Sequence, residues 1–310
     1  MTKELKLHDP WLVAVWPGMG QVAISAGYYL MAKLGMHLLT EFPAHELFDV
    51  EHVEVKDGLI RTGRLPRSRL FVWKDPQGRH DVVLFIGDAQ PSKGRYGFCH
   101  RLIEFVQDLE VEKVYTFAAM ATQMDHEAPC RVFAAATDVE TLNELRPLDP
   151  QILEDGHIGG LNGILLGVAG ERGLRGACLL GEMPHIFAQL PYPKASLAVL
   201  KAFASVAQID IDFTELTEQA HEMDQKLGEL LEQMQEAMHD QQGKPQEEPS
   251  HDQPSEEGGL SDEETERIER LFEQAKQQRS TAYELKRELD RLGVYRDYED
   301  RFLDLFKKPQ

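Results

Sequence analysis

Short runs of mostly apolar residues recur along the first two thirds of the chain, and they constrain the fold more than any other feature. Runs without apolar/polar alternation are typical of strands covered on both faces of a sheet. The strand-like runs are Trp11–Trp16, Met36–Phe42, Val50–Val55, Leu70–Trp73, Asp81–Ile86, Lys113–Ala119 and Ala177–Leu180. Helical patterns lie approximately at Gly20–Leu34, Gly94–Leu109, Val139–Leu145, Leu161–Arg172 and Lys194–Ala207. This alternation predicts an α/β domain with three layers, α/β/α.

Two turn signals within this region predict antiparallel strand pairs. Asp57-Gly58 lies between two β-prone runs, which is typical of a hairpin. The segment Pro76-Gln77-Gly78 separates two further runs and favours a second hairpin. The sequence therefore predicts a mixed sheet rather than a purely parallel one.

The first strand-like run leads into glycines spaced as in a dinucleotide-binding turn. Gly18, Gly20 and Ala23 give the spacing G-x-G-x-x-A, and Glu41 follows about twenty residues later. However, Pro17 stands directly before the first glycine, and hairpin signals rather than a second helix follow Glu41. We therefore expect these glycines to serve a tight strand-to-helix turn. Gly18 and Gly20 remain weak cofactor-binding candidates.

A second group of glycines lies in the sequence GHIGGLNGILLGVAGERGLRG. It lacks the Lys-Ser/Thr pair of a P-loop, so we expect close packing rather than phosphate binding. Gly163 and Gly167 are predicted on the buried face of a helix that approaches its neighbour closely. Gly160 near its start, and Asp88 at a predicted strand end, are weak candidates for a ligand site at the strand ends.

Residues for catalysis or metal binding do not form a recognisable set. Asp125, His126, Glu127 and Cys130 are close in sequence, but their spacing fits no strong zinc pattern. Cys99 and His100 are adjacent on a predicted helix, so their side chains diverge. We therefore expect no catalytic residues, no metal and no cofactor. A small-molecule or nucleotide-binding enzyme that uses the strand ends remains the alternative function.

The charge of the chain disfavours two classes of partner. The formal net charge is −20 over 310 residues. Such a chain repels nucleic acid and anionic lipid, so neither partner is expected. No apolar stretch reaches membrane-spanning length, the first ten residues lack a signal core, and only three cysteines are present. These features predict a cytoplasmic protein in a reducing compartment.

The last third of the chain has a different character, with apolar residues at heptad spacing. The first heptad series begins at Phe213 and ends at Ala237, and the second begins at Ile268 and ends at Leu292. We predict two long helices that pack through these residues, on each other or between subunits. The expected interface residues are Leu216, Met223, Leu227, Leu230, Met234, Ile268, Leu271, Leu285, Leu289 and Leu292.

Composition divides the chain into four predicted segments. Residues 1–212 form the α/β domain, and 213–239 the first heptad helix. Residues 240–260 are rich in Pro, Gly and acidic residues, which predicts a disordered linker. Residues 261–310 form a C-terminal helical segment, in which Ser261 and Glu264 suit a capping box at its start.

Several ordered segments of the chain together resemble the PAC2 family, which contains the proteasome assembly chaperones. The resemblance covers approximately Trp11 to Leu231, and its weight comes from the order of several weak motifs. The segments are PGMGQVA, LFIGDAQPSKGRYGFCHRLIEFV, VYTFAAMATQMDHEAPCRVFAAATD, GGLNGILLGVAGERGLRGACLLGEMPHI, PKASLAVLKAFA and IDFTELTEQAHEMDQKL.

The resemblance implies a phosphorylase/hydrolase-like α/β fold, homo-oligomeric assembly and a chaperone-like role in protein assembly, related to the proteasome. It supplies no catalytic residues to carry over. Archaeal members that dock on the proteasome end in a hydrophobic residue, tyrosine and any residue, whereas this sequence ends Lys308-Pro309-Gln310. We therefore expect the chain itself and an unidentified protein as partners, without insertion of such a tail.

Overall fold

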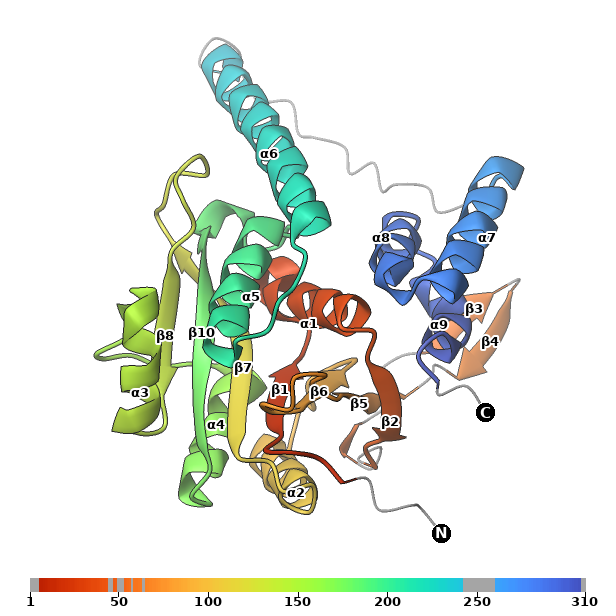
Figure 1. Ribbon diagram of the computed structural model, residues 1–310. Helices are drawn as coiled ribbons and strands as arrows, with labels where there is room; N and C mark the ends of the chain where they lie inside the picture. Colours follow the sequence, from red (N-terminus) through yellow and green to blue (C-terminus); the bar gives the residue numbers. More distant parts are fainter. Residues whose placement is uncertain are drawn as a thin grey trace.

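The computed structural model describes residues 6–43, 47–48, 53–56, 58–62, 65–241 and 260–307. Its main element is an eight-stranded sheet with strand order β2-β5-β6-β1-β7-β10-β8-β9 (Figure 1). The strands are β1 (Trp11–Val15), β2 (His37–Glu41), β5 (Ser68–Trp73), β6 (Val82–Gly87), β7 (Lys113–Thr122), β8 (Val132–Ala136), β9 (Gln151–Ile152) and β10 (Arg175–Pro184).

The sheet is mixed, as predicted. Strands β6, β1, β7 and β10 run parallel at its centre. Strand β5 is antiparallel to β6 because the two form the hairpin predicted through Gly78, and β2 continues antiparallel beside β5. At the other edge β8 is antiparallel to β10. The carboxyl ends of the central strands therefore meet at one edge of the sheet.

Helices cover both faces of the sheet, which confirms the three-layer prediction. Helices α1 (Val22–Lys33) and α5 (Pro193–Ala207) pack on one face, and α2 (Arg95–Gln107) and α4 (Gly160–Glu171) on the other. Strand β1 is apolar throughout because both of its faces are buried. Val13 and Val15 lie in the core under α1 and α5, whereas Leu12 and Ala14 lie in the core under α2 and α4.

Two strands of the sheet were missed in the sequence. Strand β8 has the sequence VFAAA, and alanine is depleted in strands, so the segment carries a weak strand signal. Strand β9 has only two residues. Helix α3 (Val139–Leu145), which follows β8, was predicted correctly, and the side chain of Asp138 caps it by accepting a hydrogen bond from Thr141 N.

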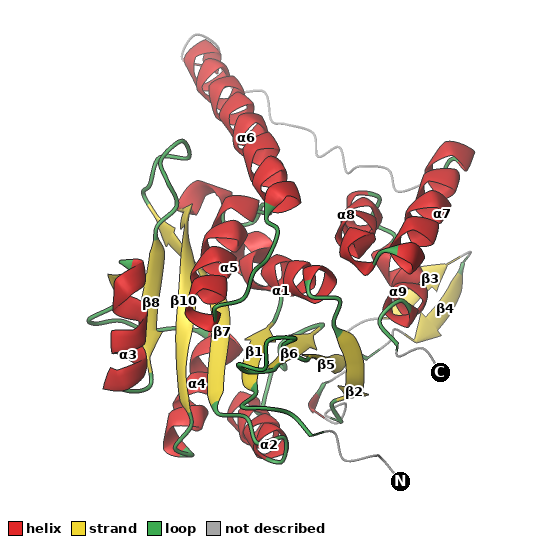
Figure 2. Ribbon diagram, in the orientation of Figure 1, coloured by secondary structure: helices red, strands yellow, loops and turns green. Residues whose placement is uncertain are grey.

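The predicted hairpin around Gly58 is present as a separate two-stranded sheet. Strand β3 (Val53–Lys56) pairs antiparallel with β4 (Leu59–Thr62). Gly58 has a φ of +73°, which favours glycine at the turn. Figure 2 shows this hairpin apart from the main sheet, on the side of the molecule where the C-terminal helices lie.

The last third of the chain is helical. Helix α6 (Thr214–Gln241) packs on α5 and projects past the α/β body at its far end (Figure 1). Residues 242–259, most of the predicted linker, lie outside the described residues. Helices α7 (Asp262–Gln277), α8 (Ala282–Arg291) and α9 (Tyr295–Asp304) then follow. Residues 260–307 are called the C-terminal module below.

The prediction of one long helix over Ile268–Leu292 was wrong. The chain is extended at Gln278, with φ −137° and ψ 102°, and a short 3-10 turn, η5 (Arg279–Thr281), leads into α8. Thr281 Oγ1 donates to Gln278 O, and Gln278 Nε2 donates to Ser280 Oγ. Such local polar contacts compete with helix continuation. The predicted capping box of Ser261 and Glu264 is present at the start of α7.

Within the described residues, no helix is both long enough and apolar enough to cross a membrane.

Candidate interaction surfaces

The glycines after β1 build a close turn against the protein's own core. Gly20 has a φ of +59°, and a Cβ there would lie 2.7 Å from Met183 Sδ. Gly20 N donates to Ala188 O, and Tyr192 N donates to Gly20 O. Gly18, in contrast, is extended at φ −168° and a Cβ there would meet no atom within 4 Å. The close turn therefore needs Gly20 more than Gly18.

The other candidates at the strand ends are also held by internal contacts. Gln90, which follows β6, bridges the end of β1 and the start of α4. Its Nε2 donates to Pro17 O at 3.3 Å, and its Oε1 accepts from Leu161 N at 3.1 Å. A Cβ on Gly160 would lie 2.8 Å from the same Oε1. Gln90 therefore occupies the space between Gly160 and the first turn.

Of the two glycines predicted on a buried face of α4, Gly163 is half-buried and tightly packed, whereas Gly167 is exposed. A Cβ on Gly163 would lie 2.1 Å from the carbonyl oxygen of Ile158, so glycine is required by a close backbone approach. This approach involves the segment before α4 rather than a neighbouring helix. Gly167 is exposed, and a Cβ there would meet nothing within 4 Å, so its predicted burial was wrong.

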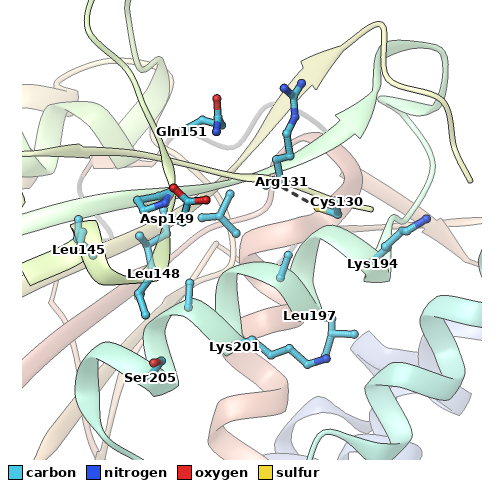
Figure 3. A pocket seen from close by; sticks show the side chains of 15 residues that line it. Cys130, Arg131, Leu145, Leu148, Asp149, Gln151, Lys194, Leu197, Lys201 and Ser205 are labelled. Carbon is cyan, nitrogen blue, oxygen red and sulfur yellow. Dashed lines mark hydrogen bonds between the residues drawn. The ribbon is translucent and has the colours of Figure 1, made fainter. Parts of the chain in front are cut away.

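A cavity of about 700 Å³ lies over the β8 side of the sheet, between α5 and the segment after α3 (Figure 3). Its apolar lining comes from Val132, Leu145, Leu148, Leu179, Leu197, Ala198 and Ala202. Three cationic side chains, of Arg131, Lys194 and Lys201, also line it. Two of these cations are already paired, because Arg131 binds Glu182 and Lys194 binds Asp224 at 2.7 Å.

The side chains of Cys130 and Arg131 in this cavity make internal contacts with Glu182. The Glu182 carboxylate is buried, and hydrogen bonds from Arg131 hold its pKa below the ordinary value. Cys130 Sγ donates to Glu182 O at 3.0 Å, and burial raises the pKa of this thiol to about 12. A thiol with that pKa is a poor nucleophile at neutral pH. Among the described residues, no group of three His, Cys, Asp or Glu side chains could hold a metal ion.

The β3–β4 hairpin carries an exposed apolar surface. Val53, Val55 and Ile60 are 50%, 68% and 73% exposed, and Val55 and Ile60 are directly opposite in the register. Residues two apart on a strand, and residues opposite each other, share one face, so these three side chains form one apolar face of the hairpin. Leu59, on the other face, is 63% exposed. Gathered apolar groups on a small protruding sheet are typical of a protein-interaction site.

The residues expected at helical interfaces are mostly covered by the chain itself. On α6, Leu216 and Leu227 are buried, Met223 is half-buried and Leu230 is 38% exposed, while the side chain of Met234 lies outside the described residues. In the C-terminal module Ile268, Leu285 and Leu289 are buried, and Leu271 and Leu292 are half-buried. That these residues make contacts between subunits stays a prediction. Among those whose side chains the structure describes, Leu230 is the most exposed and thus the best placed for such a contact.

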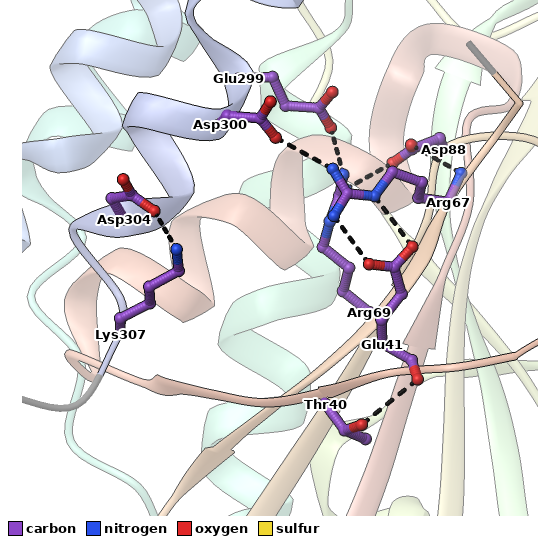
Figure 4. A network of polar contacts seen from close by, with 9 residues as sticks. All are labelled: Thr40, Glu41, Arg67, Arg69, Asp88, Glu299, Asp300, Asp304 and Lys307. Atoms are coloured by element: carbon purple, nitrogen blue, oxygen red, sulfur yellow. Dashed lines mark hydrogen bonds and ion pairs between the residues drawn. The ribbon is translucent and has the colours of Figure 1, made fainter.

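An ion cluster that sequence reasoning missed lies between β5 and α9 (Figure 4). Arg69, which is 2% exposed, donates to Asp88 Oδ1 at 3.0 Å and to Glu299 Oε1 at 2.7 Å. Arg67 donates to both Glu41 oxygens and to Asp300 Oδ1 at the surface. Burial raises the pKa of Asp88. The candidate ligand residue Asp88 is thus part of an internal ion cluster. The sequence did offer one signal for this cluster, which is the charged Arg69 inside the mostly apolar strand SRLFVW.

Comparison with known proteins gives the fold a family context. An uncharacterised protein of Methanocaldococcus jannaschii is 25% identical over 252 residues, which are 79% of this chain and 93% of that protein. The Pyrococcus furiosus protein PbaB, described as an archaeal proteasome activator, is similar with a TM-score of 0.63 and 24% identity, over 74% of this chain and 96% of PbaB.

A proteasome-assembly chaperone homologue of Mycobacterium tuberculosis has the same fold, with a TM-score of 0.61 and 22% identity, over 71% of this chain and 94% of the homologue. The model of the PAC2 family matches residues 12–231, which include the sheet except Trp11, the first residue of β1, and most of α6. The C-terminal module lies outside this match. Because the family model matches more than half of its residues, this chain belongs to the PAC2 family.

Proposed function

We propose that this chain is an oligomeric, chaperone-like interaction module that acts in the assembly of a protein complex, and that its partner is a proteasome subunit. The observation that carries the proposal is the exposed apolar face of the β3–β4 hairpin on a PAC2 domain. A two-stranded hairpin is marginally stable by itself in water. Binding a partner protein would bury Val53, Val55 and Ile60 and stabilise the hairpin at the same time.

Two relatives of the same fold support the choice of partner. PbaB is described as a proteasome activator, and the Mycobacterium tuberculosis protein as a proteasome-assembly chaperone homologue. The alternative, a small-molecule enzyme at the strand ends, has less support. Gln90 and Arg69 already engage the polar groups at Gly160 and Asp88. A thermal-shift screen with nucleotides, nucleosides and NAD tests that alternative, because a ligand of the native state raises its stability.

The proposal is tested by co-sedimentation of the full chain with proteasome α subunits from the organism that produces this chain. The matched variants are Ile60→Asp in the hairpin and Val139→Asp on α3. The two original side chains are 73% and 72% exposed, so both changes leave the core intact. We expect Ile60→Asp to weaken binding at least about tenfold, because a charge would be buried in an apolar contact. Val139→Asp should bind as the wild-type chain does. Equal binding by both variants, or none by the wild-type chain, would contradict the proposal.

A further inference from the structure

The C-terminal module lies outside the family match, yet it packs tightly against the PAC2 domain. Helix α8 and the turn η5 contact α1, and Leu38 N on β2 donates to Phe306 O at 2.8 Å. The Phe71 and Phe306 rings meet edge to face with centroids 6.2 Å apart. Phe302 and Phe306 are almost completely buried. The module therefore covers a defined face of α1, β2 and β5, called the docking face below.

An aromatic group of the docking face contacts aromatic and cationic groups of the module. The Tyr28 ring packs edge to face on Tyr295 and Phe302, with centroids 6.0 and 6.2 Å away. Tyr28 OH and Tyr295 OH share a hydrogen bond of 3.0 Å. Lys286 Nζ lies 4.5 Å from the Tyr28 ring centroid and 3.8 Å from that of Tyr295. The hydroxyls of Tyr28 and Tyr295 therefore satisfy each other only while the module is docked.

Charge complementarity fixes the orientation of the module. Arg69 comes from β5 and Arg67 directly precedes this strand, whereas Glu299 and Asp300 are consecutive residues of α9 (Figure 4). Arg69 and Glu299 are both largely buried, so removal of the module would leave the buried Arg69 cation with Asp88 alone and one partner fewer. The docking face thus has a strong preference for an acidic, aromatic helix of this kind.

Residues 242–259 are the covalent connection between the end of α6 and the module. A chain of this length reaches at most about 60 Å when fully extended. Two copies of the chain could therefore exchange their modules without the loss of any contact at the docking face. Exchange of an identical element between protomers is a common route to an oligomer.

We propose that the docking face also binds the C-terminal module of a second copy of this chain, so that Glu299 and Asp300 of one copy reach Arg69 and Arg67 of another. The contacts are the ones described above, and only the connection through residues 242–259 differs. The inference concerns the part of the chain outside the family match, so it goes beyond the proposed role in assembly. It stands or falls independently of any proteasome partner.

Cross-linking of mixed chains distinguishes exchange from docking within one chain. One chain carries Arg67→Cys and the other Asp300→Cys, at positions whose side chains lie 3.0 Å apart in the folded protein. Both chains also carry Cys130→Ser, because Cys130 is the native cysteine that is not fully buried. Cys99 and Cys178 are buried and are left in place. The chains are refolded together from urea and treated with a short bismaleimide. A single chain with both new cysteines serves as the positive control for docking.

Exchange predicts a covalent dimer in the mixture and none with either variant alone. The dimer should disappear when the Asp300→Cys chain also carries Phe302→Asp, which removes the docking contact of α9 while leaving the cysteine in place. If the mixture gives no covalent dimer while the doubly substituted chain is cross-linked internally, the module docks only within its own chain, and the inference is overturned.

Discussion

Arg69 on β5 donates a hydrogen bond of 2.7 Å to Glu299 on α9, although 230 residues separate them in the sequence. The same guanidinium donates to Asp88 at 3.0 Å. One buried cation therefore holds together the edge of the PAC2 domain and the C-terminal module. Because the cluster is buried, removal of a single partner costs more than the loss of a surface ion pair.

The first prediction compares the two acidic residues of α9. Glu299→Gln should lower the free energy of unfolding by about 3 kcal/mol, because Arg69 would keep its charge in a buried site with one partner fewer. Asp300→Asn removes a partner of Arg67 at an exposed position, where an ion pair contributes at most about 1 kcal/mol. Urea denaturation of both variants measures the difference. Equal losses for the two would mean that the buried Arg69–Glu299 pair holds the module no more strongly than the exposed Arg67–Asp300 pair.

The second prediction concerns the turn after β1. Gly20→Ala should lower the free energy of unfolding by about 2–4 kcal/mol, because alanine is strained at φ +59° and its Cβ would overlap Met183. Gly18→Ala should change it by less than about 0.5 kcal/mol, since the site is extended and open. Thermal denaturation of the two variants is the measurement. A large loss of stability in Gly18→Ala would mean that Gly18 has a role other than forming this turn.

The third prediction concerns two glycines of α4 with opposite expected signs. Gly163→Ala should destabilise the chain, because the new Cβ would lie 2.1 Å from Ile158 O, a backbone atom that cannot move alone. Gly167→Ala should stabilise it by about 0.5–1 kcal/mol, since alanine is the better helix former at an exposed position. The denaturation midpoint should fall for Gly163→Ala and rise for Gly167→Ala. Destabilisation by Gly167→Ala would show that this surface is covered in solution.

The fourth prediction is a pH dependence that arises from Glu182. Its pKa is lowered in the folded chain, chiefly by hydrogen bonds from Arg131. A lowered pKa contributes stability that is present above the ordinary value of 4.5 and is lost as the pH falls through the folded value. At pH 7, Glu182→Gln should be less stable than the wild-type chain by about 1–3 kcal/mol. Urea denaturation at several pH values should show the gap closing below pH 4.5, and a constant gap would rule out this origin.

The α/β core was predictable from the sequence because its strands and helices follow local patterns. The run Trp11–Trp16 is apolar on both faces, and β1 lies between two helical layers. The turn at Gly58 and the capping box at Ser261 follow from local rules as well. Strand β8 was missed because its pairing with β10, and not its alanine-rich sequence, determines its conformation.

The surfaces were harder to predict because they depend on contacts between distant segments. The heptad pattern identified the buried face of α7 and α8, but the break at Gln278 arises from local side-chain hydrogen bonds that a periodicity does not reveal. Nothing in the sequence pairs Arg69 with Glu299. The exposure of Val55 and Ile60 likewise depends on whether another element covers the hairpin, which only the three-dimensional structure shows.

The native mass of the full chain, measured by light scattering at several concentrations, decides whether this protein works as an assembled interaction module. A proposed role in assembly through contacts between copies predicts a species whose mass is at least twice, and a whole multiple of, 35.2 kDa. The mass should fall toward one chain on dilution, as expected for non-covalent association. A single species of 35.2 kDa at all concentrations up to about 100 μM, well above the Kd of a stable interface, would contradict oligomeric assembly.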